Sequence, residues 1–312
     1  MLDILAITGP VYLVIATGYA ATRAGLFAKA ELRVLGRFIV NIALPAMLFN
    51  ALSRRPIAEV LNPAYALVYL GATLPLIAAG WAWCRRRGLA PGTAAVVAMG
   101  ISCPNSAYVG YPILLLILPQ VAGVALALNM LIENVIVIPL LLALAESGRG
   151  GGSGWQVLRQ SLQRLARNPM IIGLALGIAV SLSGLTPPGP LTRTVDLFAV
   201  TSGALSLFVI GGTLVGLPMR RMGLKVAPIA AGKLLAHPLL MGGLGLALPL
   251  LGGPALDPSL RTAALVIAAM PMMSIYPILA QAYGKEDLAA AALLVTTLAS
   301  FFTLSGLLWL ER

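Results

Sequence analysis

The chain has 312 residues, of which 59% are hydrophobic and only 10% are charged. Soluble domains carry about 25% charged residues, so a surface that faces water cannot be built from this composition. The composition therefore excludes a soluble globular enzyme, a disordered chain and a disulfide-stabilised scaffold. The mean hydropathy of +0.95 predicts a protein whose surroundings are membrane lipid.

The net charge of +11 does not indicate a nucleic-acid partner in a chain of this kind. Basic residues are typical of the cytoplasmic loops of membrane proteins, and we interpret the charge in that way. The two cysteines, Cys84 and Cys103, lie at the end of or within apolar stretches. Their spacing predicts neither a metal site nor a disulfide.

Ten apolar stretches are long enough to cross a bilayer, which takes about 20 helical residues. They cover residues 3–22, 33–53, 64–84, 92–118, 121–145, 169–186, 195–217, 226–250, 259–282 and 288–310. The first stretch has Asp3 at its start and Arg23 after its end, which is the reverse of the charge order of a signal peptide. We therefore expect an all-α membrane protein with ten transmembrane helices.

The basic residues also indicate how these spans are oriented. If the N-terminus lies outside, 14 of the 21 lysines and arginines fall in cytoplasmic connections, 5 fall outside, and Arg37 and Lys233 lie within spans. Positive residues are enriched on the cytoplasmic side of membrane proteins. The sequence therefore predicts a multi-pass protein with both termini outside.

The longest connection, 146–168, separates the fifth span from the sixth. Its glycine- and serine-rich start at 147–154 is typical of a flexible linker. The large apolar residues of 155–165 follow at helical spacing on one face, with arginines elsewhere. This pattern predicts a basic helix on the cytoplasmic lipid surface, and a simple cytoplasmic start to the sixth span is the alternative.

The linker divides the chain into two halves of five spans, 1–145 and 169–312. Short matches recur in the same order in both halves at offsets of 159 to 165 residues, and the Tyr-Pro-Ile-Leu of 111–114 returns at 276–279. Because five is odd, the second half must enter the membrane from the opposite side. The pattern predicts two inverted five-helix repeats, the architecture of many secondary transporters.

Prolines interrupt the fourth and the ninth span, one span in each half. Pro104 and Pro112 are eight residues apart, and Pro271 and Pro277 are six apart. This spacing breaks a helix, and backbone groups set free in lipid must face protein or a wet cavity. At about 1.5 Å per residue, Pro104 lies roughly 18 Å into its span, near the middle of the bilayer.

Matched breaks in two halves are the strongest sequence pointer to the substrate site of a transporter. The helix starts that follow the breaks offer N–H groups and partial positive charge, which suit a carboxylate. We expect the substrate to be bound by the two breaks and by one polar residue of the second span. These residues are Pro104, Asn105, Ser106, Gly110, Pro112, Pro271, Met272, Ser274, Pro277 and Asn41. The alternative is a pair of proline kinks that only shape the bundle.

The run Pro-Asn-Ser-x-Tyr-x-Gly-Tyr-Pro at 104–112, its proline-containing counterpart at 271–277 and Leu44-Pro45 in the second span resemble the auxin efflux carrier family. That family includes the plant PIN carriers and bacterial members, among them malonate carriers. The resemblance covers essentially the whole chain. It implies a fold similar to bile-acid/sodium symporters, in which broken helices four and nine cross. It also implies a scaffold of spans one, two, six and seven, a homodimer, and a transport domain that moves like an elevator.

The resemblance further implies a role for Asn105, because the asparagine of the span-four break lies at the carboxylate site in family members. Plant members also have an asparagine in the span-nine break, where this chain has Met272, Met273 and Ser274. This difference disfavours an indole substrate. A short dicarboxylate such as malonate, carried across a bacterial inner membrane, is what the resemblance implies for this chain.

A few polar side chains lie deep within spans, where they are costly and therefore candidates for function. Glu133, next to Asn134, is either a proton carrier or ion ligand, or a hydrogen-bonded structural group. Lys233 either faces inward, toward an anion or Glu133, or snorkels to the cytoplasmic surface. His237 either relays protons or is structural. Asp196, near the outer end of the seventh span, is expected to be solvated.

These features predict a secondary transporter or uniporter for a small-molecule carboxylate, working by alternating access. The alternatives are a sodium-coupled, bile-acid-like symporter and a ligand-sensing receptor on the same fold. The sequence has no phosphate-binding glycine loop, no Ser-His-Asp candidate and no metal-ligand cluster. We therefore expect neither an enzyme nor a cofactor, with a proton or a sodium ion as the coupling ion.

Overall fold

The structure, a computed structural model, describes residues 2–54, 62–147, 163, 166–216 and 223–310. Regular secondary structure within these ranges is helical, apart from one isolated β-bridge. In the same ranges, six helices are long and apolar enough to cross a membrane, and four shorter apolar helices accompany them. The all-α prediction is confirmed, whereas ten spans in two inverted repeats stay a prediction.

The chain forms two compact units, and each unit combines segments from both halves of the sequence. Unit 1 is drawn from Met1–Asn62, Ser106–Met130 and Arg164–Val215, and unit 2 from Pro63–Asn105, Leu131–Gln163 and Gly216–Arg312. The spans that the resemblance assigns to a scaffold, one, two, six and seven, fall together in unit 1. The second half of the fourth span and the first half of the fifth also belong to unit 1, which the resemblance did not imply.

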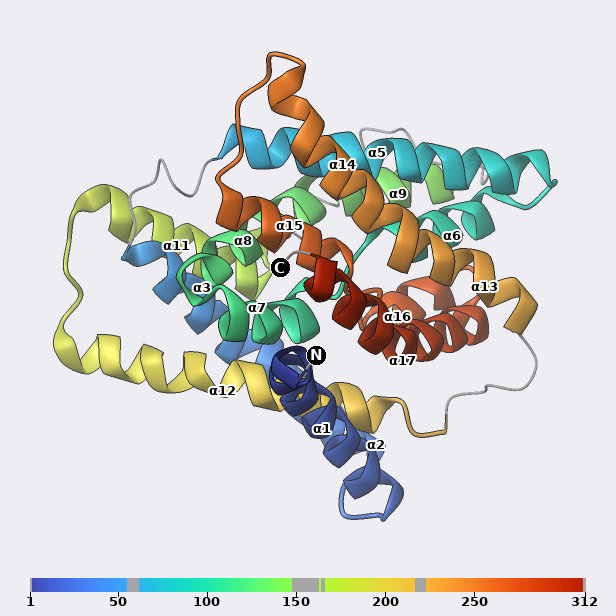
Figure 1. The fold of residues 1–312 in the computed structure, drawn as a ribbon. Coiled ribbons are helices and arrows are strands. Elements are labelled where there is room, and N and C mark those ends of the chain that lie inside the picture. Colours follow the sequence, from blue (N-terminus) through green and yellow to red (C-terminus); the bar gives the residue numbers. More distant parts are fainter. Residues whose placement is uncertain (1, 55–61, 148–162, 164–165, 217–222, 311–312) are drawn as a thin grey trace. The chain divides into compact units, whose positions relative to one another are not determined.

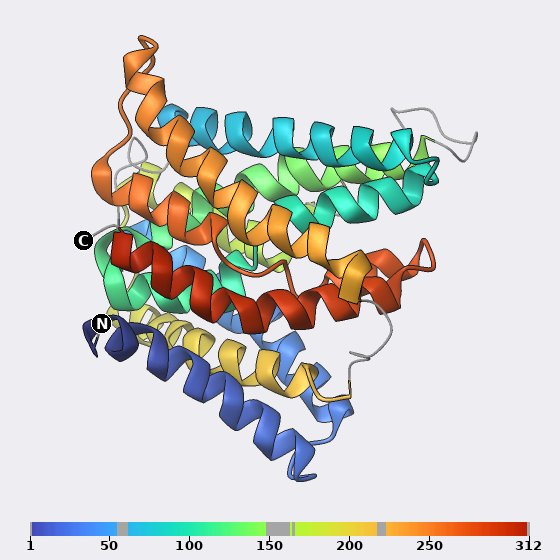
Figure 2. The same ribbon diagram turned by 45° about the vertical axis from the view of Figure 1, so that its right-hand side comes forward.

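Unit 1 is built from long helices that pack along one another. Its helices and π-helical turns are α1 (Leu2–Arg23), α2 (Lys29–Phe38), η1 (Ile39–Ala43), α3 (Leu44–Ser53), η2 (Ser106–Gly110), α7 (Tyr111–Ile117), α8 (Pro119–Ile132, as far as Met130), α11 (Pro169–Ser183) and α12 (Gly189–Thr213). Helix α12 packs against α1 and α3, and α3 packs against α11. Figure 2 shows α1 and α12 side by side.

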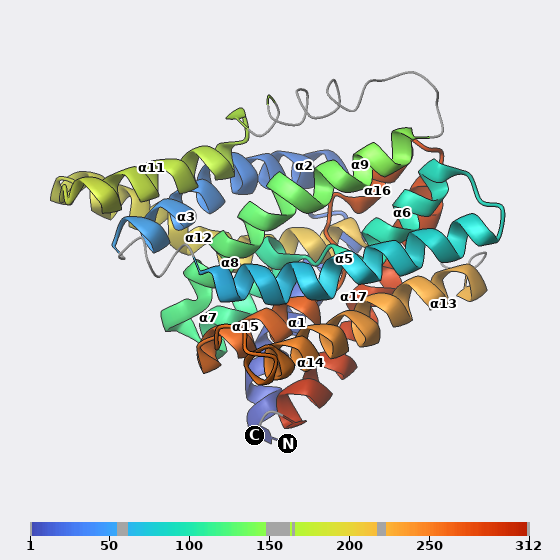
Figure 3. The same ribbon diagram turned by 90° about the horizontal axis from the view of Figure 1, so that it is seen from above.

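Unit 2 contains the first half of the fourth span and the whole of the ninth. Its elements are α5 (Pro63–Arg86), α6 (Pro91–Ser102), η3 (Glu133–Val137), α9 (Ile138–Glu146), α13 (Gly223–Ala231), η4 (Gly232–Ala236), α14 (His237–Leu250), α15 (Pro258–Ala268), α16 (Tyr276–Gln281) and α17 (Glu286–Leu310). Helix α6 packs against α5 and α9, as can be followed in Figures 1 and 3, and α16 packs against α17.

Helical segments coincide with the ten predicted stretches, and the two predicted interruptions are present. The fourth stretch is helical up to Ser102 and again from Ser106, and the ninth up to Ala268 and again from Tyr276. The surface helix predicted within the linker 146–168 falls outside the described residues.

Four of the helical stretches contain a π-helical turn that ends two residues before a proline. These prolines are Pro45, Pro112, Pro139 and Pro238, which follow η1, η2, η3 and η4. Proline lacks an N–H group and its ring crowds the carbonyl group of the preceding turn, so the helix widens locally. The widened turns contain predicted site residues in every case, namely Asn41, Ser106, Gly110, Glu133, Asn134 and Lys233.

Glycines allow α1 and α12 to approach closely. A Cβ atom on Gly18 would lie 2.0 Å from the Phe208 carbonyl oxygen, and one on Gly211 would lie 1.8 Å from the Ile15 carbonyl oxygen. Neither position has room for a side chain. At Gly203, also on α12, no atom of another described part of the chain lies within 4 Å of the Cβ position.

The Gly211→Ala variant is expected to lose about 1–3 kcal/mol of stability, because its methyl group pushes α12 away from α1. The matched Gly203→Ala variant has space for the methyl group and is expected to be neutral or more stable by up to about 1 kcal/mol, since alanine favours the helix. Thermal unfolding of the purified proteins in detergent measures both effects. Equal unfolding temperatures for the two variants would contradict the close packing.

Candidate functional site

The two helix breaks of unit 2 are hydrogen-bonded to each other through their backbones. The Asn105 N–H donates to the Pro271 carbonyl at 2.7 Å, and the Met273 N–H donates to the Cys103 carbonyl at 3.1 Å. Between these bonds, Pro104 lies opposite Met272 in an antiparallel bridge. Each break thereby supplies hydrogen-bond partners that the other lost when its helix stopped.

Two neutral polar side chains lie at this backbone pairing. Asn105 Nδ2 donates a hydrogen bond to Ser274 Oγ at 2.9 Å. Asn105 is buried and Ser274 is half-buried, and the adjacent Pro271 and Met272 are buried. The structure therefore brings together the predicted residues of both breaks in unit 2, while Pro277 lies farther on, half-buried in the first turn of α16.

The other residues of the span-four motif belong to unit 1. Ser106 begins η2, and its hydroxyl accepts a hydrogen bond from Asn129 Nδ2 of α8 at 2.5 Å. Asn129 was not predicted as a site residue, and its buried Oδ1 has no hydrogen-bond partner within the described part of the chain. Gly110 and Pro112 are buried in the same segment.

Asn41, the predicted contact from the second span, is exposed in unit 1. Its side-chain amide donates to the Arg37 carbonyl of its own helical stretch at 2.7 Å. The accepting carbonyl belongs to α2, two residues before η1 begins.

Five buried polar side chains form a connected group in unit 2. The Tyr69 hydroxyl of α5 donates to Glu133 Oε1 at 2.8 Å, and the Tyr69 ring lies edge-on to the His237 ring with centroids 6.3 Å apart. His237 Nε2 lies 3.2 Å from the Thr73 hydroxyl, and its Nδ1 lies 3.1 Å from Lys233 Nζ. With Lys233 as an ammonium group, which only donates, Nδ1 is the acceptor and Nε2 carries the hydrogen.

Lys233 also connects this group to the break of the ninth span. Its Nζ donates to the carbonyl of Ala268, the last residue of α15, at 2.6 Å. The carbonyl groups at a helix end lack partners within the helix and carry partial negative charge, so a cation is well placed there. The snorkelling alternative for Lys233 is wrong, because the side chain is 0% exposed.

The sequence correctly placed Glu133, Lys233 and His237 deep in the protein, but it missed their partners Tyr69 and Thr73. All five side chains are at most 2% exposed. Asn134, the neighbour of Glu133 in η3, is half-buried. Within the described ranges, no group of three or more His, Cys, Asp or Glu side chains is arranged to hold a metal ion.

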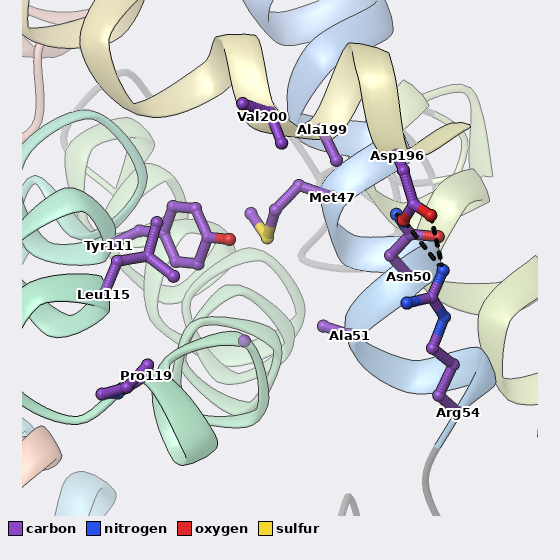
Figure 4. Close-up of a pocket in the computed structure, with 11 residues that line it drawn as sticks. Met47, Asn50, Ala51, Arg54, Tyr111, Leu115, Pro119, Asp196, Ala199 and Val200 are labelled. Atoms are coloured by element: carbon purple, nitrogen blue, oxygen red, sulfur yellow. Dashed lines mark hydrogen bonds and ion pairs between the residues drawn. The ribbon is translucent and has the colours of Figure 1, made fainter. Parts of the chain in front are cut away.

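A cavity of about 720 Å³ lies in unit 1 among α3, α7, α8 and α12 (Figure 4). At one end of it, Arg54 Nη2 donates to both carboxylate oxygens of Asp196, at 2.8 and 3.0 Å. Asn50 Nδ2 donates to the same carboxylate at 2.6 Å. Asp196 is exposed to solvent as expected, with 43% of its side chain accessible, and it also links α12 to the end of α3.

Broken helices that pair through their backbones, with buried polar side chains nearby, are typical of membrane transporters. The chain matches the family described as "Membrane transport protein" over residues 8–308, and it belongs to that family. This is the family of the auxin efflux carriers, so the resemblance carried by residues 104–112 is confirmed. The protein is a multi-pass membrane transporter, and the members of its family are transporters rather than enzymes.

Several relatives resemble the chain over much or all of its length. A Rhizobium meliloti (strain 1021) protein named "Putative malonate transporter" is 32% identical, over 100% of this chain and 97% of its own. The "Uncharacterized transporter" of Methanothermobacter thermautotrophicus is 25% identical over 94% of both chains. The "Uncharacterized transporter YfdV" of Escherichia coli (strain K12) is 24% identical over 66% of this chain and 67% of its own.

Proposed function

We propose that this protein is a secondary transporter or uniporter that carries a short carboxylate of the malonate class across a bacterial inner membrane. The observation that carries the proposal is the Asn105–Ser274 hydrogen bond at the paired breaks, because it concentrates neutral polar groups inside an apolar helical protein. The name and full-length match of the Rhizobium meliloti relative support the malonate class.

In this proposal, the carboxylate accepts hydrogen bonds from Asn105 Nδ2 and from the Ser274 hydroxyl, which turn from each other toward the substrate. The backbone bond from the Asn105 N–H to the Pro271 carbonyl holds the asparagine in place before the substrate arrives. A donor held in its binding position loses little freedom when the ligand binds. Neutral donors also allow release, since no fixed charge retains the anion.

We further propose that ten spans form two inverted repeats and that the transporter works as a homodimer by an elevator-type movement. The near-constant offsets of the sequence matches support the repeats. The division into two compact units, each with its own packed helices, supports a movement of one unit as a body. The charge bias of the loops supports an orientation with both termini outside.

For the coupling ion, we propose a proton carried by Glu133. Its carboxyl group accepts from the Tyr69 hydroxyl, and the buried Lys233 and His237 belong to the same polar group. A buried carboxylate is costly to keep charged when its hydrogen-bond partners or nearby positive charges move away. In this proposal, Glu133 therefore takes up or releases a proton as its surroundings change during the transport cycle.

The Asn105→Ala variant is expected to lose saturable uptake of labelled malonate in liposomes, because the amide donor at the paired breaks is gone. The matched control is Thr297→Val, which removes a buried hydroxyl of unit 2 that donates within its own helix, to the Leu293 carbonyl. The control is expected to transport at close to the wild-type rate. Wild-type uptake by Asn105→Ala would contradict the proposed site, and binding of malonate without flux would favour a sensor.

The Glu133→Gln variant is expected to flatten the dependence of malonate uptake on pH, because glutamine has a similar shape but cannot take up a proton. Glu286→Gln, which removes an exposed carboxyl group at the start of α17, is the control and is expected to keep the wild-type profile. Uptake rates measured across a series of imposed proton gradients give both profiles. An unchanged profile in Glu133→Gln would exclude this residue as the proton carrier.

A further inference from the structure

The cavity of unit 1 has a polar end and an apolar wall. Figure 4 shows Arg54, Asn50 and Asp196 gathered at one end, with Met47 and Val200 among the residues that face the space. The volume of about 720 Å³ is within the range of small-molecule sites. A compound with a polar head and a short aliphatic body matches this division of the lining.

The polar end already holds a carboxylate, that of Asp196. Arg54 contacts it through Nη2 alone, which leaves the remaining guanidinium N–H groups outside this ion pair, and Asn50 adds its amide donor. A guanidinium group can bind carboxylates with two parallel bonds, so the present geometry does not use its full capacity. The same donors therefore suit a carboxylate that comes from a ligand.

The ion pair is open enough for such an exchange. The side chains of Arg54 and Asp196 are 54% and 43% exposed. Ion pairs with this much access to water contribute little to stability, so an incoming carboxylate displaces Asp196 at small cost.

One further group in the cavity can donate a hydrogen bond to the rest of a ligand. The Tyr111 hydroxyl points into the cavity toward Met47 (Figure 4). Tyr111 belongs to the span-four motif, so the motif contributes to this cavity as well as to the helix break.

We propose that this cavity is a second carboxylate-binding site, in which a carboxylate of the substrate replaces Asp196 on Arg54. The ligand class is a short aliphatic carboxylate, with the Asn50 amide N–H groups beside Arg54 and the Tyr111 hydroxyl donating to its remaining oxygen atoms. The inference rests on the proposed function. It adds a positively charged side chain, which the residues of the paired breaks do not supply. Asn105 and Ser274 are neutral, and Lys233 already binds the Ala268 carbonyl, whereas Arg54 supplies a positive charge that attracts an anion.

The test compares malonate binding by two variants, each of which removes one partner of the ion pair. If the ion pair were purely structural, both variants would change malonate binding in the same direction. Arg54→Gln is expected to weaken malonate binding about tenfold or more, because a charged hydrogen-bond donor is lost. Asp196→Asn is expected to strengthen it several-fold, because the competing carboxylate is gone. Binding is measured by titrating malonate into the purified full-length protein at constant ionic strength, with the thermal shift as a second readout that also reports folding.

Two further variants act as controls. Arg193→Gln removes an exposed positive charge from the same helix, about one turn before Asp196, and is expected to bind malonate as the wild type does. Arg54→Lys keeps the charge but not the planar group, and is expected to bind more tightly than Arg54→Gln and more weakly than the wild type.

The possible outcomes separate this inference from the proposed function. Opposite shifts in Arg54→Gln and Asp196→Asn support the second site. Shifts of both variants in the same direction, or wild-type affinity in Arg54→Gln, overturn it even if malonate uptake persists and depends on Asn105. A wild-type protein that neither binds nor transports malonate overturns the proposed function, and the inference with it.

Discussion

The two backbone hydrogen bonds between the helix breaks, from Asn105 to Pro271 and from Met273 to Cys103, answer the main constraint on this protein. Lipid offers no hydrogen bonds, so a helix can stop within a membrane only where protein groups replace its lost partners. Here each broken helix supplies such partners to the other. The pairing fixes the position of Asn105, and the proposed recognition of a carboxylate depends on that position.

The same constraint explains where the other polar groups lie. The carbonyl at the end of α15 is bonded by Lys233, so the buried cation and the second break belong to one arrangement. Prolines near the π-helical turns widen the helices, and those turns contain several polar residues of the predicted site, although Asn105, Ser274 and His237 lie outside them. The groups that satisfy the interrupted backbone and the polar side chains proposed to function therefore lie together. A carbonyl group without a helical partner and a buried polar side chain both need a polar neighbour.

Much of this could be predicted from the sequence, because the signals are local. Apolar length predicted the helical stretches, and the prolines at 104 and 271 predicted the breaks. Tyr69 and Thr73 could not be found in this way, since their partners lie 64 and 164 residues away and a hydroxyl in an apolar helix forms no pattern. The pair of Arg54 and Asp196 spans 142 residues. The sequence places Asp196 near the outer end of the seventh span, but nothing in it indicates a contact with Arg54.

The central claim is that the paired breaks are reached from one side of the membrane and then from the other. The two cysteines are buried, which makes a single reporter thiol practical once they are replaced by alanine. A cysteine introduced by Ser274→Cys would be treated with a membrane-impermeant maleimide in right-side-out and in inside-out vesicles. The account predicts labelling from both sides, slowed by malonate in each case. Labelling from one side only, unaffected by malonate, would contradict it.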